Sequence, residues 1–155
     1  MINEKGQTLI EALIALGAAV VIISAIAVVV ITSVSNSDFS KYQNLATQYA
    51  QQGIDIMRSQ SESDWTSFTV KAGTFCLSKG TANLGAPVTN CNTPNVDNFF
   101  VREVIITQAS ASCQGSAKVA VDVSWSSGKC SASNLYCHSV LLDTCLANIN
   151  SVSAP

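Results

Sequence analysis

Glu11 is the residue of this chain whose position most clearly calls for a chemical partner. It stands at the start of an otherwise apolar and uncharged stretch, Ala12–Ile31. A charged side chain inside a bilayer costs roughly 2.5–3.5 kcal/mol at the centre of a spanning helix and less near its end. An apolar residue at this position would avoid that cost, so the acid indicates a partner that compensates its charge.

Cysteines are the second group of residues with chemical potential. The chain has six, and all of them follow the apolar stretch: Cys76, Cys91, Cys113, Cys130, Cys137 and Cys145. An even number in a domain outside the membrane predicts disulfides formed in an oxidising compartment. The neighbouring pair Cys137-His138 raises the alternative of a metal site. However, no Cys-x-x-Cys pair exists and Cys130 is too distant from Cys137 for a zinc knuckle, so we expect no metal ligand and interpret His138 as an ordinary surface or strand-end residue.

No catalytic arrangement is evident in the sequence. There is a single histidine, and neither a Gly-x-Ser-x-Gly motif nor a phosphate-binding loop occurs. Glu62 and Asp64 lie close together, but in a polar segment where solvated charges are the simpler interpretation. Fully oxidised cysteines would leave no thiol nucleophile. We therefore expect a protein that is not an enzyme and has no cofactor.

The charge pattern gives no support for nucleic-acid binding. The chain has 155 residues, a formal net charge of −2 and only 12% charged residues. Acidic and basic residues are interspersed beyond Asp38, without a basic stripe that would neutralise phosphates. The length suits one small domain and an anchor.

Two helical patterns follow one another at the N-terminus. Ala12–Ile31 would span roughly 30 Å as a helix, which is the thickness of a bilayer core and longer than the apolar part of a cleaved secretory signal. Lys5 before it places the bulk of the chain outside the cytoplasm. From Phe39 onwards, apolar residues recur at steps of three and four, which predicts an amphipathic helix. We expect one helix from about Thr8 to Arg58, with Tyr42 and Tyr49 packed on a globular head.

The remainder of the chain predicts a small antiparallel sheet. Ser59–Trp65 is interpreted as a polar connector, with Trp65 and Phe68 as a lid near the helix end. The expected strands are Thr74–Leu77, Phe99–Thr107, Lys118–Trp125 and Ser139–Leu146, the second being central because both its faces are apolar. Short turns join the last three strands into a meander, and Gly80–Asn98 is a long loop. The fold class is therefore α+β.

The meander also predicts how the cysteines pair. Cys130 and Cys137 lie in the same connection between strands, so they can bond across it. Cys113 lies in the preceding turn at the opposite end of the sheet, to which the chain returns at Cys145. The remaining pair, Cys76 and Cys91, would then close the base of the long loop.

The N-terminus resembles that of type IV pilins and of the pseudopilins of type II secretion. The resemblance rests on Lys5-Gly6-Gln7-Thr8-Leu9-Ile10-Glu11 followed directly by the apolar stretch, and it covers about the first 30 residues closely. In that family a short polar leader ends in Gly, and Glu is the fifth residue of the mature chain. A looser similarity to the heads of minor pilins lies in Arg102-Glu103-Val104 and the alternating strand that ends in Ser124-Trp125.

The resemblance implies a processing and assembly route. A prepilin peptidase would cut between Gly6 and Gln7, and the new amine of Gln7 would be methylated and would meet Glu11 of a neighbouring subunit. The expected parts are a leader (1–6), a transmembrane and assembly helix (7–35), an amphipathic helix (36–58) and a head (59–155).

Under this interpretation the chain is a structural subunit of a type IV pilus or pseudopilus. Its partners would be other pilin subunits, the peptidase and the assembly machinery of the inner membrane. It would begin as a single-pass protein with its head outside and would end in an extracellular pilus or periplasmic pseudopilus. The alternatives are a monomeric membrane-anchored binding domain and, less favoured, an anchored enzyme. A simple tether would need no acid in its membrane segment.

Overall fold

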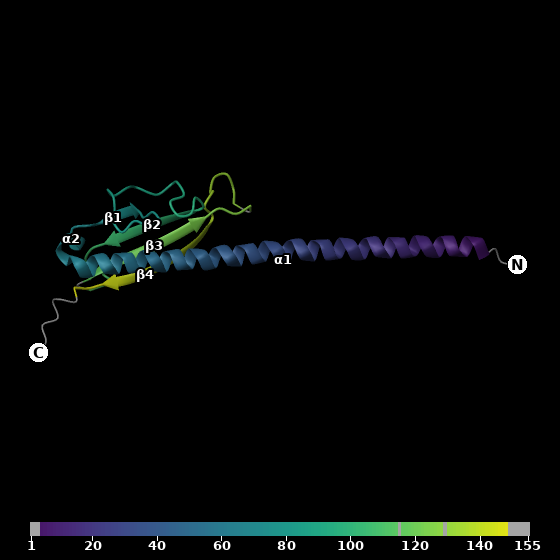
Figure 1. Cartoon of the computed structure of the whole chain (residues 1–155), viewed down its shortest axis with the longest axis horizontal. Helices are drawn as coiled ribbons and strands as arrows, with labels where there is room; N and C mark the ends of the chain where they lie inside the picture. The colour runs from purple at the N-terminus through teal and green to yellow at the C-terminus, as the bar shows by residue number, and fades with distance from the viewer. Residues whose placement is uncertain (1–3, 115, 129, 149–155) are drawn as a thin grey trace, which may run out of the picture. The chain divides into compact units, whose positions relative to one another are not determined.

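The computed structural model of the chain describes residues 4–114, 116–128 and 130–148, and it describes side chains from Thr8 onwards. The chain forms two compact units, Met1–Ser40 and Lys41–Pro155, which are treated separately below. The elements are α1 (Glu4–Ser63), α2 (Trp65–Thr69), β1 (Gly73–Cys76), β2 (Phe100–Thr107), β3 (Ala117–Trp125) and β4 (His138–Leu146), as labelled in Figure 1.

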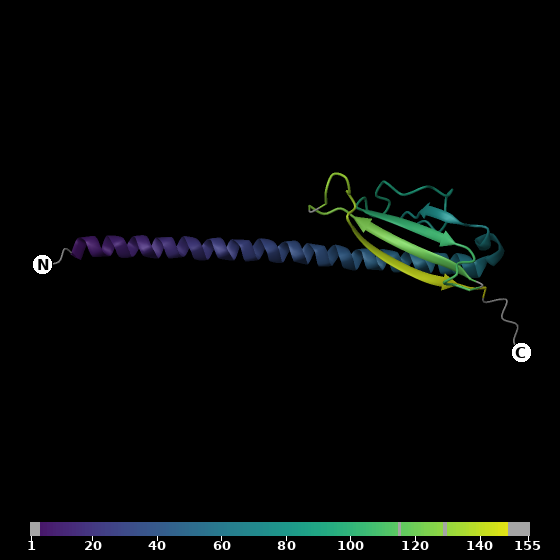
Figure 2. The same cartoon turned by 180° about the vertical axis from the view of Figure 1, so that it is seen from behind.

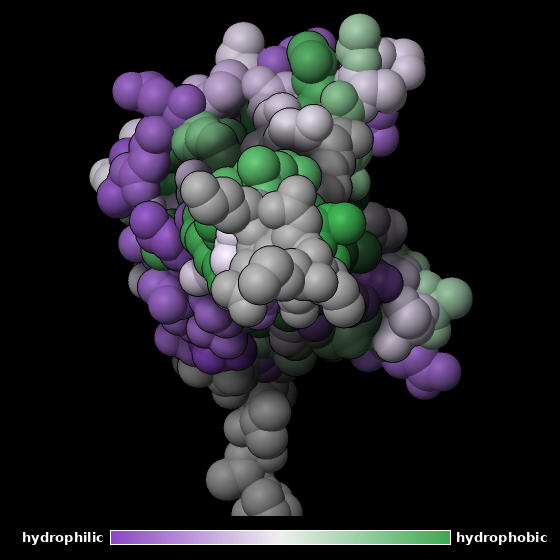
Figure 3. Space-filling model, turned by 90° about the vertical axis from the view of Figure 1, so that its right-hand side faces the viewer, coloured by the Kyte–Doolittle hydropathy of each residue, from purple (hydrophilic) through white to green (hydrophobic). Residues whose placement is uncertain are grey.

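The first unit is the N-terminal part of α1, and its apolar side chains are exposed on all sides. Every residue from Thr8 to Ser40 is exposed, and in Figure 3 hydrophobic side chains surround the N-terminal end of the helix. Two hydroxyls within it are satisfied locally, since Ser24 Oγ donates to the Val20 carbonyl at 2.8 Å and Thr32 Oγ1 donates to the Val28 carbonyl at 2.9 Å. Such a helix leaves few polar groups without partners when water is absent.

In the second unit, residues 41–63 of α1 lie across one face of the sheet (Figures 1 and 2). Small and flexible apolar side chains make this contact: Ala46, Ala50 and Met57 are completely buried. Gly53 permits the closest approach, because a Cβ built on it would lie 2.8 Å from Val121 Cγ1. The predicted amphipathic stripe is therefore the packed face of residues 41–63. We call these residues the head helix, and the whole unit Lys41–Pro155 the head.

Aromatic residues pack against one another at the edge of this contact between helix and sheet. The Tyr42 ring lies 4.6 Å from the Phe99 ring, and the Tyr49 ring lies 5.3 Å from the Phe100 ring, measured between centroids. Both tyrosines are partly buried and pack against the core. Their predicted packing role is confirmed.

The predicted connector, Ser59–Trp65, is wrong for most of its length. α1 continues through Ser63, because this segment contains neither Gly nor Pro and Ser61 is buried, with its hydroxyl donating to the Arg58 carbonyl at 2.7 Å. The break comes at Asp64, which caps α2 by accepting a hydrogen bond from the Ser67 amide at 3.0 Å. Phe68 of α2 is buried, and Trp65 stacks on it with the ring centroids 5.9 Å apart.

The sheet is the predicted antiparallel meander, with the order β1-β2-β3-β4. Each observed strand begins within one residue of its predicted start, and the last three end where predicted. β2 is an interior strand and buries residues on both faces, including Val101. Pairing places Val104 beside Val121, and Val121 beside Leu142, on the face that meets the helix. A helix packed on one face of an antiparallel sheet confirms the α+β class.

Candidate functional site

The candidate assembly segment is the N-terminal part of α1, with Glu11 as its acid. The backbone of Gly6 and Gln7 belongs to α1, but the side chain of Gln7 lies outside the described residues, as does Met1–Asn3 of the predicted leader. Glu11 itself is exposed. Among the described residues, α1 from Thr8 onwards is the one helix that is long and apolar enough to cross a membrane.

In the described part of a single copy, the apolar side chains of this segment are exposed. Leu9, Leu13 and Ile31 are 65%, 61% and 70% exposed, and the apolar residues between them are exposed to a similar extent. A helix that is hydrophobic on all sides is stable only in lipid or among other helices. Glu11 would be taken into that environment with its neighbours, so its charge would need compensation there.

The head carries the three disulfides that the strand order predicted. They join Cys76 to Cys91, Cys113 to Cys145 and Cys130 to Cys137, with Cα–Cα distances of 5.7, 5.6 and 5.4 Å. The second and third pairs lie at opposite ends of the meander. The first pair closes the long connection between β1 and β2.

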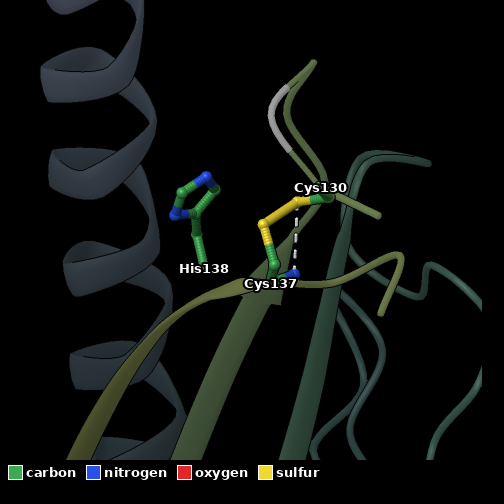
Figure 4. A group of neighbouring side chains, drawn as sticks. All are labelled: Cys130, Cys137 and His138. Atoms are coloured by element: carbon green, nitrogen blue, oxygen red, sulfur yellow. Dashed lines mark hydrogen bonds between the residues drawn. A yellow bond between two sulfur atoms is a disulfide. The ribbon is translucent and has the colours of Figure 1, made fainter. Parts of the chain in front are cut away.

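Cys130, Cys137 and His138 are the described residues that come closest to a metal-binding group. Their potential ligand atoms all lie within 4.8 Å of one another. Figure 4 shows, however, that the two sulfurs are bonded to each other and that the amide of Cys137 donates to Cys130 Sγ, at 3.3 Å. The His138 ring instead lies 2.8 Å from Ser127 Oγ through its Nε2 atom and packs on Trp125. A disulfide supplies no thiolate, so the oxidised group has no strong ligand set.

Arg102 is the residue that sequence reasoning missed. In the sequence it is one of the interspersed charges, yet it is completely buried between the head helix and the start of the long loop. Its guanidinium donates to the carbonyls of Leu77 and Ser78 at 2.9 and 3.0 Å, and to the Tyr49 carbonyl at 3.1 Å. A further donor reaches Gln52 Oε1 at 3.0 Å.

Burial lowers the pKa of Arg102, because desolvation disfavours its charge. The cation is held by neutral oxygens from two segments that are far apart in the chain. It thus links the head helix to the loop after β1. The signal that could have revealed this role is its place on the inner face of β2, in register with the apolar Phe100 and Val104.

A second linkage holds the end of the same loop. The side chain of Asn95 pairs with the backbone of Arg102 through two hydrogen bonds, as a neighbouring strand would. Its Nδ2 atom donates to the Arg102 carbonyl at 2.9 Å, and its Oδ1 atom accepts from the Arg102 backbone amide at 2.8 Å. Asp97 accepts hydrogen bonds from the Tyr49 hydroxyl and from Lys79 Nζ, the latter at 2.5 Å. These two donors lower the pKa of Asp97, with Lys79 having the larger effect.

No protein-family model, curated protein or solved structure matches this chain. The head shows extensive linkages that stabilise its fold, and the exposed apolar helix with Glu11 is the part that the fold of one copy does not explain.

Proposed function

We propose that this chain is a structural subunit, either a pilin or a minor pilin or pseudopilin, of a type IV pilus or type II secretion pseudopilus. The observation that carries the proposal is Glu11, the fifth residue after Gly6, in a helix whose apolar side chains are exposed on every side. A bundle of such helices would cover these side chains. It would also bring the acid of one copy close to the N-terminal amine of another.

The proposed route begins in the inner membrane, with the head outside. A prepilin peptidase cuts between Gly6 and Gln7, the amine of Gln7 is methylated, and the assembly machinery moves the subunit into the filament. Inside a bundle of low dielectric, the positive amine compensates the charge of Glu11, and an unpaired acid would be penalised. Charge pairing therefore selects the register in which neighbouring helices assemble.

Two measurements test this proposal. The intact mass of the mature protein reports cleavage after Gly6, methylation of Gln7 and oxidation of the cysteines together. Glu11→Ala should leave cleavage unchanged and reduce incorporation into filaments at least about tenfold. The variant would leave the amine of a neighbouring copy buried without its partner, which costs about 3–5 kcal/mol, and a tenfold change corresponds to about 1.4 kcal/mol. Asp38→Ala, which removes another exposed acid from the same unit, is the matched control and should assemble normally.

Two results would contradict this proposal. A mature N-terminus at Met1 would exclude processing after Gly6. Cleaved Glu11→Ala protein that enters filaments as well as the Asp38→Ala control would remove the role of the acid. A membrane-anchored monomeric binding domain would then be the better interpretation.

A further inference from the structure

Strand β4 forms an open edge of the head sheet. It is the last strand in the order β1-β2-β3-β4 and pairs with β3 over its nine residues. Within the described parts of the chain, the backbone of residues 139–146 has no hydrogen-bonded partner other than β3. In an antiparallel pair, the outward-facing N–H and C=O groups of an edge strand remain available to a further strand.

The opposite edge of the sheet is covered. The long loop returns alongside β1, where the Val88 amide donates to the Thr74 carbonyl at 2.8 Å and the two residues form an antiparallel bridge. The linkages of Arg102 and Asn95 hold both ends of that loop in place. One edge is therefore protected by the chain itself, whereas β4 is not.

Disulfides fix both ends of the open strand. Cys137 immediately precedes β4 and is bonded to Cys130, and Cys145 is the penultimate residue of β4 and is bonded to Cys113. Two of the three crosslinks thus hold this one strand in its extended form. A template fixed in this way loses little conformational entropy when another strand is added to it.

The strand has few of the features that usually prevent edge pairing. β4 contains no Lys, Arg or Pro, which are common protective residues at sheet edges, and its one carboxylate, Asp143, is paired with Lys118 of β3. Leu141 on the outer face is 60% exposed, and Val140 and Leu142 on the inner face are only partly buried. An added strand would cover apolar side chains on both faces.

Charge indicates what kind of strand would fit. Near Leu141 the outer face carries two acids, Asp122 and Asp143, and one base, Lys118, which pairs with Asp143 at 2.9 Å. The balance of these three residues is two negative charges and one positive, or −1. Glu103 lies beyond Asp122 on β2, where its carboxylate accepts the Cys91 amide at 3.1 Å. A second copy paired through its own β4 would bring two such acidic faces together, whereas a strand with Lys or Arg beside apolar residues would complement the face.

We infer that the β4 edge is a docking site for an extended segment of another polypeptide in which basic and apolar residues alternate. The segment adds a fifth strand to the sheet through main-chain hydrogen bonds. Its apolar residues cover the Val140–Leu142 side, and its basic residues face the acids of the outer face, where their aliphatic stems cover Leu141. This site uses the head alone and does not depend on the proposed filament.

The test uses the full chain, labelled with 15N, in a nonionic detergent. The probe is a capped peptide as long as β4 that consists of alternating Lys and Val. One control peptide carries Glu in place of Lys. The other is the Lys peptide with every second backbone nitrogen methylated along the edge that would face β4, which removes the donors needed for pairing. Amide hydrogen exchange within β4 and fluorescence anisotropy of the labelled peptide are the two measurements.

The expected result is protection of alternate amides in β4 by the Lys peptide, with weaker binding of the Glu peptide and no protection by the methylated one. Leu141→Lys should weaken binding roughly tenfold or more, because it removes a buried apolar contact and adds a like charge. Val70→Lys, which changes a residue that is 81% exposed in the same unit, should bind as the unaltered protein does.

Three results would overturn the inference. Equal binding of the Lys and Glu peptides would remove the charge argument. Undiminished binding of the methylated peptide would exclude strand addition. Protection of β4 amides that rises with protein concentration in the absence of peptide would identify a second copy, and not a basic segment, as the occupant.

Discussion

Replacing Arg102 by Met tests whether a buried cation without a carboxylate partner stabilises the head. The change keeps most of the aliphatic volume but removes four donated hydrogen bonds, three of them to backbone carbonyls. The Leu77 carbonyl would remain close to the core without this donor, whereas the Ser78 carbonyl would still accept from the amide and the hydroxyl of Thr81, at 3.3 and 2.8 Å. A buried acceptor left unsatisfied costs about 1–3 kcal/mol.

Relief from the desolvation of Arg102 reduces the destabilisation expected for Arg102→Met. Desolvation of the guanidinium disfavours the folded state, as the lowered pKa of Arg102 indicates, and Met avoids that penalty. Apolar replacement of buried ions is favourable when all partners are replaced together, but here the carbonyl oxygens stay in place. We therefore expect a net loss of about 1–2 kcal/mol in the free energy of unfolding.

Denaturant unfolding of the full chain in detergent, monitored by the near-UV circular dichroism of the aromatic core, measures this loss. Arg58→Met is the matched control, because the Arg58 side chain is 52% exposed and forms only a surface pair with Asp55 at 3.7 Å. It should change the stability by less than about 0.5 kcal/mol. An Arg102→Met protein as stable as this control would refute the argument that the linkage between helix and loop stabilises the head.

Two further predictions concern the head. Gly53→Ala should destabilise it by about 1–2 kcal/mol in denaturant unfolding, because the new Cβ would lie 2.8 Å from Val121, whereas Gly85→Ala, with no atom within 4 Å, should be nearly neutral. Asp122→Asn should raise the midpoint of thermal unfolding at neutral pH. Burial, together with the nearby Glu103, raises the pKa of Asp122 above its ordinary value of 3.8 against an opposing hydrogen bond from Ser139. The folded state thus binds the proton more tightly, so stability should fall as the pH rises through this raised pKa. The advantage of the Asn variant should vanish below the ordinary value, and an advantage that persists in acid would contradict the electrostatic explanation.

Periodicity was sufficient to predict most of this fold. The alternation of Val119, Val121 and Val123 specified both the strand and its buried face, and the meander then placed the cysteines in pairs. The alternating pattern and the short turns were enough to predict the strand pairing, because short connections leave adjacent antiparallel strands few ways to pair. The end of α1 was harder to predict, because a polar segment without Gly or Pro is compatible with either a connector or a further helical turn.

Contacts between segments that are far apart in the chain determine the features that the sequence pattern does not predict. Arg102 looks like a surface charge in the sequence, and only the carbonyls of Leu77 and Ser78, which reach it across the fold, make its burial possible. The protection of one sheet edge by Val88 was also unpredictable, because that loop has no periodicity. The proposed assembly site would be formed by several copies in a membrane, so in one chain it is visible as the sequence motif around Glu11.

Glu11 and the head can be tested independently, and this separation makes the assembly experiment interpretable. The core, the three disulfides and the buried Arg102 all belong to the unit Lys41–Pro155, whereas Glu11 belongs to Met1–Ser40. Substitutions at distant sites without shared partners have nearly additive effects on stability. Glu11→Ala should therefore leave the unfolding free energy of the head unchanged. A loss of filament incorporation in that variant would then report on the contact between subunits and not on a damaged subunit.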